Sequence, residues 1–113
     1  MISFVNLTPH TVTVDNSQGE PVVFPASGRV ARVSSSRQVG AVVAGINVYE
    51  TVLGEPDELV PEQDTIYIVS RLYATAFLAK PGNAKYRDVI LVPGELKRDA
   101  AGNIIGCDGL SRI

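Results

Sequence analysis

A strand, a helix and a second strand follow one another between residues 65 and 92, and this order restricts the fold more than any other feature. The run Thr65-Ile66-Tyr67-Ile68-Val69-Ser70-Arg71 is rich in β-branched and aromatic residues and ends at a polar pair. Residues 72–80 then have helical periodicity, and the strand-like residues 88–92 end at Pro93-Gly94. In such units the carboxyl ends of the strands usually hold small anionic ligands. The pattern therefore favours ligand binding without identifying the ligand.

The helix is predicted over residues 72–80 from its ends. Ser70 is suited to cap the amino terminus, Lys80 suits the last turn, and Pro81 stops the helix. The periodicity places Leu72, Ala76 and Ala79 on one side, with Tyr73, Phe77 and Lys80 beside it. Residues 83–87 are long enough for a parallel return to the second strand, and an antiparallel return is the alternative.

The rest of the chain predicts short strands separated by Gly, Pro and Asn turns. A hairpin is expected around Ala44-Gly45. Val30 and Val33 would not lie on the same face of a regular strand, so the strand at 29–33 would need a bulge near Ala31 or Arg32. The strands are expected at residues 2–7, 11–15, 21–24, 29–33, 38–43, 46–53, 95–98 and 104–107. We therefore predict an α+β fold: a mainly β small domain, 1–113, with short hairpins and one principal helix in a strand–helix–strand unit.

Composition limits the partners. The net charge of −2 argues against nucleic-acid or acidic-membrane binding, both of which depend on a Lys/Arg excess. A single cysteine, Cys107, fits a reducing compartment, and the first residues lack the pattern of a signal peptide, so a cytoplasmic location is expected. Because 45% of the residues are hydrophobic and only 19% are charged, a chain this short is also expected to form a homo-oligomer.

Two sets of residues are candidates for anion binding. Ser70 and Arg71 combine a hydroxyl, a guanidinium and free helix N–H groups at the strand–helix junction. Arg29 and Arg32 lie close to the serines at 34–36, and Arg37 follows them. The alternatives are an ordinary helix cap with a solvated arginine and, for the second set, a solvated hairpin or an intersubunit salt-bridge face.

The segment at residues 6–10 is a third candidate. Asn6, Thr8 and His10 would bind a ribose or base edge, or His10 would act as a base near neutral pH. The alternative is a turn in which Asn6 and Thr8 satisfy backbone groups and His10 is partly exposed.

Cofactor and metal motifs are missing from the sequence. There is no Gly-rich loop with a Lys, no Gly-x-Gly-x-x-Gly, and one Cys and one His cannot supply a zinc site. The acidic residues Asp57, Glu58, Glu62 and Asp64 have no His or Cys nearby in the sequence and are expected at the solvent surface. We therefore expect no cofactor and no metal.

Four segments carry a resemblance to a known group of proteins. They are Asn-Leu-Thr-Pro-His at 6–10, Tyr-Ile-Val-Ser at 67–70, Leu-Val-Pro-Gly-Glu-Leu at 91–96 and Arg-Asp-Ala-Ala-Gly-Asn-Ile-Ile-Gly-Cys at 98–107. In this order the chain resembles small proteins of phage and prophage genomes, which implies the host cytoplasm as a setting. By analogy with phage anti-defence sponges, we expect it to bind a host immune nucleotide signal, such as the ADP-ribose messengers of Thoeris systems, without cleaving it.

Three function classes follow. The first is a binding module that encloses a nucleotide-like molecule, using Arg71, Arg29 or Arg32 for phosphate and residues 6–10 for ribose or base. The second is a small hydrolase with His10 as its base, which the absence of a nucleophile motif or paired carboxylates disfavours, so no catalytic residue is predicted. The third is a virion assembly or host-protein-binding factor, which needs no pocket.

Overall fold

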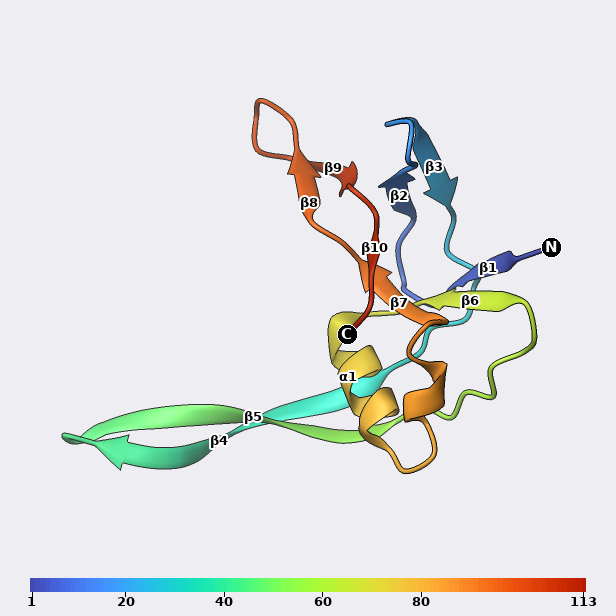
Figure 1. Cartoon of the computed structure of the whole chain (residues 1–113). Coiled ribbons are helices and arrows are strands. Elements are labelled where there is room, and N and C mark those ends of the chain that lie inside the picture. Colours follow the sequence, from blue (N-terminus) through green and yellow to red (C-terminus); the bar gives the residue numbers. More distant parts are fainter.

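The buried core lies around helix α1 (Arg71–Ala79) and the two strands that flank it in sequence, β6 (Thr65–Ile68) and β7 (Ile90–Pro93), in a computed structural model that describes residues 1–113 (Figure 1). Strands β6 and β7 pair in parallel, so the predicted strand–helix–strand unit and its parallel return are confirmed. The core side chains are Leu7, Tyr67, Val69, Tyr73, Ala74, Phe77, Ile90 and Val92.

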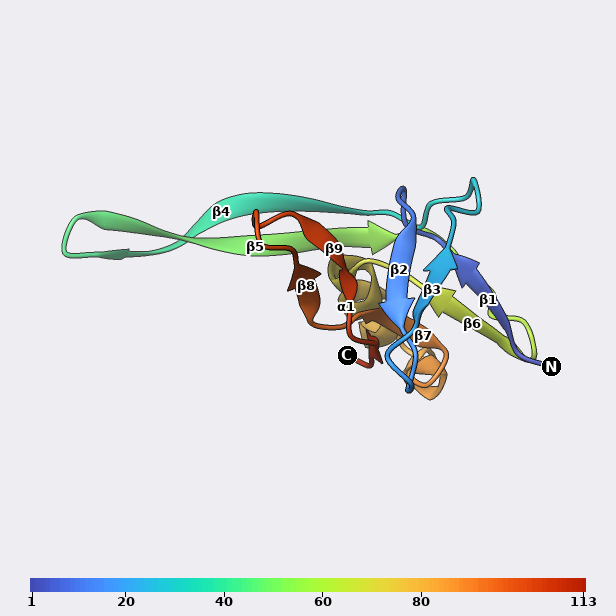
Figure 2. The same ribbon diagram turned by 90° about the horizontal axis from the view of Figure 1, so that it is seen from above.

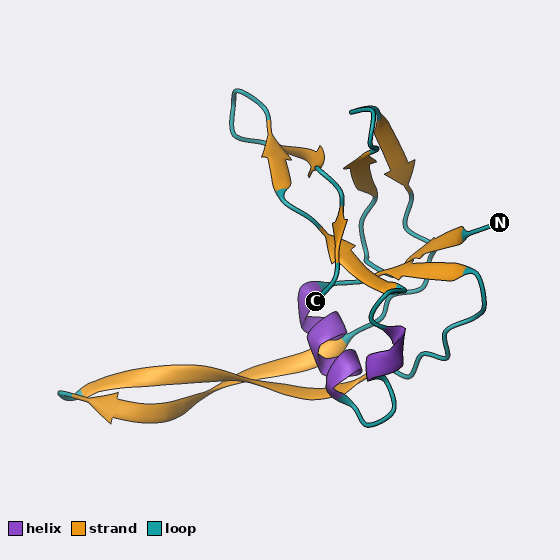
Figure 3. Cartoon of the chain, viewed as in Figure 1, coloured by secondary structure: helices purple, strands orange, loops and turns teal.

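The prediction of a mainly β α+β fold is also confirmed, because 45% of the chain is in strands and 11% is helical, of which one α-helix is the main part (Figure 3). A short 3-10 turn, η1 (Ala84–Tyr86), follows the helix. The other strands are β1 (Ser3–Asn6), β2 (Val12–Asp15), β3 (Pro21–Phe24), β4 (Val33–Val43), β5 (Ile46–Pro56), β8 (Leu96–Arg98), β9 (Ile104–Cys107) and β10 (Leu110–Ser111). No helix is long and apolar enough to cross a bilayer.

The strands form three sheets. One has the order β1-β6-β7-β10, in which β1 runs parallel to β6 and Ser3 pairs with Thr65. A second has the order β3-β2-β9-β8, and β2 meets β9 only at Val14 and Cys107. The hairpin β4–β5 forms the third sheet by itself and extends far from the body of the molecule (Figures 1 and 2). We call this hairpin the arm.

Helix α1 lies one residue earlier than predicted. The Ser70 hydroxyl accepts a 3.2 Å hydrogen bond from the Tyr73 N–H, as expected of a cap, and Lys80 lies just beyond the last helical residue. The buried residues are Tyr73, Ala74 and Phe77, whereas Leu72 is exposed. In so short a helix with four alanines or threonines, the two large aromatic rings decide which side faces the core.

The arm differs most from the sequence prediction. The prediction of a strand at residues 29–33 is wrong, because β4 begins only at Val33. The Ala31 N–H instead donates to the Leu7 carbonyl, and the Arg32 carbonyl accepts from the Asp57 N–H. These two residues therefore bond to segments far away in the sequence and not to one neighbouring strand. The register shifts lie between Val33 and Ser35 and between Val39 and Ala41. The bulge therefore does not occur at Ala31 or Arg32.

Candidate functional site

A pocket of about 400 Å³ lies at the amino terminus of α1, next to the loop after β1 and the segment that leads into β4. Its volume falls within the usual range for small-molecule sites. We call it the helix-terminus pocket. It is lined by Leu7, Thr8, Pro9, Val30, Ala31, Arg32, Val33, Ser34, Ser70 and Leu72.

Polar side chains in the pocket favour an anion. Arg32 is its only charged residue, Ser34 and Ser70 supply hydroxyls that can donate to an anion, and no carboxylate lines it. Arg32 takes part in none of the three ion pairs of the protein, so its guanidinium is free to meet a ligand. A forked guanidinium binds phosphate through two parallel hydrogen bonds.

The helix adds donors at the same place. The Ser70 hydroxyl accepts from the Tyr73 N–H, and the Ser70 carbonyl accepts from the Ala74 N–H at 2.9 Å. The N–H groups of Arg71 and Leu72 have no acceptor within the protein. Because the Ser70 hydroxyl proton is not used by the cap, it is also available to donate. These donors and the partial positive charge of the helix terminus point to the same kind of ligand.

The remaining wall is apolar. It consists of Leu7, Pro9, Val30, Val33 and Leu72, with Ala31 between the two valines. Leu7 is almost fully buried, and Ala31 and Val33 also pack against the core, so these side chains are held in place. A fixed apolar wall beside a cationic group suits a molecule that has both a flat ring and a phosphate.

Asn6, predicted to bind ligand, instead builds the loop that forms one side of the pocket. Its buried side chain donates to the carbonyls of His10 and Phe24 at 2.8 and 2.9 Å. Its Oδ1 accepts from the Thr8 N–H and from the Thr8 hydroxyl at 2.9 and 2.7 Å. All of its hydrogen-bonding groups are therefore used within the protein, which is the turn interpretation of this segment. The Thr8 hydroxyl proton is used in the bond to Asn6, so Thr8 lines the pocket but does not donate to an anion.

The structure brings together Thr8, Arg32 and Ser70 from the seven predicted ligand-binding residues and leaves three others apart. His10 is exposed and does not line the pocket. Arg29 lines a separate cavity of about 130 Å³ beside Asp57 and Glu58, where an anion would be repelled. Arg71 opens the helix but is exposed and outside the pocket lining. Arg37 lies on the arm, with its guanidinium 4.1 Å from the ring centre of Tyr49.

Sequence reasoning missed the apolar half of the pocket. The prediction of a strand at 29–33 includes both Val30 and Val33, and their failure to alternate is the signal that this segment is not a strand. The periodicity groups Leu72 with two alanines on one side of the helix, but as the second helical residue it lies beside the helix terminus and lines the pocket. Nothing in the serine run at 34–36 distinguishes Ser34, which lines the pocket, from its two neighbours.

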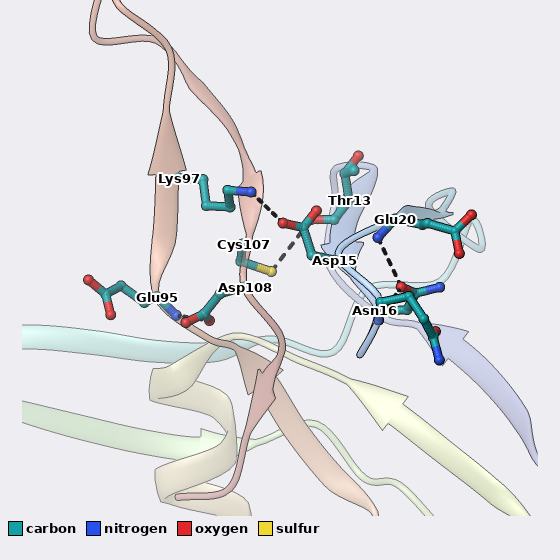
Figure 4. Close-up of polar contacts among 9 residues, drawn as sticks. Thr13, Asp15, Asn16, Glu20, Glu95, Lys97, Cys107 and Asp108 are labelled. Atoms are coloured by element: carbon teal, nitrogen blue, oxygen red, sulfur yellow. Dashed lines mark hydrogen bonds and ion pairs between the residues drawn. The ribbon is translucent and has the colours of Figure 1, made fainter.

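Two other cavities suit an anion less well. One of about 430 Å³ is lined by Asp57 and Glu58 together with Lys80. The other, of about 230 Å³, has no charged residue in its lining and lies between β2 and the hairpin β8–β9. Contacts across that seam are structural, because Lys97 forms an ion pair with Asp15 that raises the pKa of Lys97, and the Cys107 thiol lies 3.5 Å from the Thr13 carbonyl oxygen (Figure 4).

No group of three or more His, Cys, Asp or Glu side chains lies close enough together to hold a metal ion. No protein-family model matches the chain, and no curated protein or solved structure is found to be similar to it.

Proposed function

We propose that this protein binds a small phosphate-bearing molecule of the nucleotide class in the helix-terminus pocket and holds it without cleaving it. One observation carries the proposal: the pocket combines the unpaired Arg32 with the hydroxyls of Ser34 and Ser70 at a helix terminus, and no carboxylate lines it. Phosphate would lie near Arg32, Ser70 and the free N–H groups of α1, and the ring would lie against the apolar wall.

Binding is favoured over hydrolysis by the chemistry of the lining. The pocket offers donors and apolar surface, but no histidine, cysteine or carboxylate that could take a proton from an attacking water. His10, the base considered for a hydrolase, does not line the pocket. From the expectation, based on the segments at 6–10, 67–70, 91–96 and 98–107, that this is a phage protein, we propose a host immune signal of the ADP-ribose type as the ligand that it sequesters.

Calorimetry with ADP-ribose, AMP, adenosine and inorganic phosphate tests the proposal. We expect ADP-ribose or AMP to bind, and Arg32→Ala to weaken binding at least tenfold, since hydrogen bonds to charged groups contribute about 1.5–3 kcal/mol each. The matched control is Arg87→Ala, because Arg87 is exposed, lies outside the pocket and has no side-chain hydrogen bond. Chromatography of the nucleotide released by heating should return it unchanged.

Two results would contradict this function. Conversion of the bound nucleotide during incubation would make the protein an enzyme. If none of the four probes binds the wild-type protein, the third function class, an assembly or host-protein-binding factor, becomes the better explanation. That second candidate draws support from the arm, whose apolar tip has no covering element in its own chain.

A further inference from the structure

The outer half of the arm is apolar and carries no charge. Residues 39–49, which include the turn, contain no Asp, Glu, Lys, Arg or Pro. Its large side chains are strongly exposed, with Val42 and Ile46 at 63% and 66% of their full accessible area. Exposed apolar strands without charge or proline are rare at free sheet edges, because such edges pair with other chains.

Both faces of the arm are apolar. Residues that pair across two antiparallel strands lie on the same face, so Val39 and Tyr49 share one face while Ala41 and Val48 share the other. Val43 pairs with Ile46 at the turn. A strand pair that covered the body of its own molecule would need only one apolar face. Here neither face of the outer half touches the body, since every residue from 34 to 52 is exposed.

The accessible area is larger than that of a compact monomer of the same mass. The chain exposes 7568 Å², whereas a compact monomer of this mass exposes about 6,000 Å². The radius of gyration is 16.5 Å, against about 13 Å for a compact domain of this length. The excess of about 1,600 Å² is large compared with the roughly 800 Å² that each partner buries in a stable complex. An isolated two-stranded ribbon is also only marginally stable in water.

We propose that residues 39–49 of the arm form the self-association surface of this protein and are covered by a second copy of the chain. A second copy supplies the same uncharged apolar patch, so two arms related by a two-fold axis cover each other. The net charge of only −2 gives little repulsion between copies. A bilayer is a poorer occupant, because both outer edges of the arm expose backbone N–H and C=O groups that hydrocarbon cannot satisfy.

The inference is independent of the proposed ligand. The arm joins the body at Val33 and Ser34, which line the helix-terminus pocket, but the uncharged residues lie at the far end of both strands. Loss of ligand binding would therefore leave the association surface unchanged. The two ideas fail separately: calorimetry tests the first, and the oligomeric state tests the second.

Sedimentation of variants tests the association surface. The wild-type protein should be a dimer or larger at micromolar concentration. Val42→Lys and Val48→Lys place a charge on opposite faces of the arm, and the one on the covered face should weaken association at least tenfold. Val60→Lys is the matched control, because Val60 is an equally apolar residue that is 74% exposed outside the arm. A wild-type monomer at 100 µM, or arm variants that associate as tightly as the wild type, would overturn the proposal. So would a monomer that floats with lipid vesicles.

Cross-linking keeps the test valid if a lysine variant fails to fold. The natural thiol, Cys107, is buried, so a short bismaleimide should join Val48→Cys chains through the arm alone. We expect a cross-linked dimer for Val48→Cys and none for Val60→Cys. Equal yields for the two variants would place the contact elsewhere.

Discussion

The Tyr73 hydroxyl donates a 2.7 Å hydrogen bond to the backbone carbonyl of Asp57. Tyr73 lies in the first turn of α1 and is fully buried, whereas Asp57 follows the last residue of β5. The Asp57 carboxylate in turn accepts from the Arg32 N–H at 2.9 Å. These contacts hold both ends of the arm against the helix and fix the backbone of Arg32 beside the pocket.

Tyr73→Phe should destabilise the protein by about 1–2 kcal/mol, because the substitution leaves the Asp57 carbonyl without its partner while it keeps the ring. Urea denaturation measures the change in the free energy of unfolding. Tyr86→Phe is the control, since Tyr86 is half-buried and its hydroxyl has no hydrogen bond. Equal losses in the two variants would mean that the hydrogen bond adds nothing.

Alkaline pH should lower the free energy of unfolding through Tyr73. Burial of the ring, and next the Asp57 carboxylate, raise the pKa of Tyr73 from 10.0 to about 12. The unfolded chain therefore releases this proton first. The stabilisation that the protonated Tyr73 contributes is fully present below pH 10 and is lost as the pH rises from 10 to about 12. The difference in unfolding free energy between the wild type and Tyr73→Phe should shrink over this interval. A constant difference would contradict the shift.

Asn6→Ala should cost about 2–4 kcal/mol, because four hydrogen bonds are lost and the carbonyls of His10 and Phe24 lose a donor. Thermal unfolding followed by circular dichroism should show a lower midpoint. The matched control is Asn103→Ala, since Asn103 is exposed and its side chain makes no hydrogen bond. A change at Asn6 as small as at Asn103 would show that the loop holds its shape without the amide.

Gly94→Ala should destabilise the β7–β10 end of the central sheet by about 1–3 kcal/mol. A Cβ at Gly94 would lie 2.7 Å from the carbonyl oxygen of Gly109 and 2.7 Å from the Asp108 carboxylate, and the first of these is backbone. At Gly109 a Cβ meets no atom within 4 Å. Gly109→Ala should therefore unfold at nearly the wild-type urea concentration, and a matching loss at both glycines would contradict the predicted clash.

Arg71→Ala should weaken ADP-ribose binding less than threefold, whereas Arg32→Ala should weaken it at least tenfold. Both side chains are arginines near the start of α1, but only Arg32 lines the helix-terminus pocket. Calorimetry of the two variants under the same conditions ranks them. The reverse order would place the phosphate outside the pocket, above the first turn of the helix.

Much of the central unit could be predicted because its signals are local. Ser70 caps the helix, Pro81 follows it, and the β-branched residues before Ser70 favour a strand. The pairing of β1 with β6 left no local signal, since the partner strand lies in the second half of the chain. The segment before Val33 was misread for the same reason: its backbone bonds to Leu7 and Asp57, which no neighbouring residue reveals.

The candidate site was only partly predictable. Hydroxyls and arginines could be identified as anion-binding types, but composition cannot show which arginine lines a cavity together with carboxylates. Arg29 lines a cavity with Asp57 and Glu58, while Arg32, three residues later, lines the helix-terminus pocket and bonds to the Asp57 carboxylate only through its backbone N–H. The apolar wall depends on contacts between segments far apart in the chain, so the sequence could not reveal it.

The pairing of β1 with β6 affects the order in which the chain can fold during synthesis. Ser3 pairs with Thr65 and Asn6 with Ile68, so the first strand has no partner in this sheet until β6 has left the ribosome. The arm closes around a two-residue turn and needs no later residue, so it is the first long element able to form. On a polysome, emerging chains would then present their apolar arms to one another before any of them had a completed core, and assembly could begin between nascent chains.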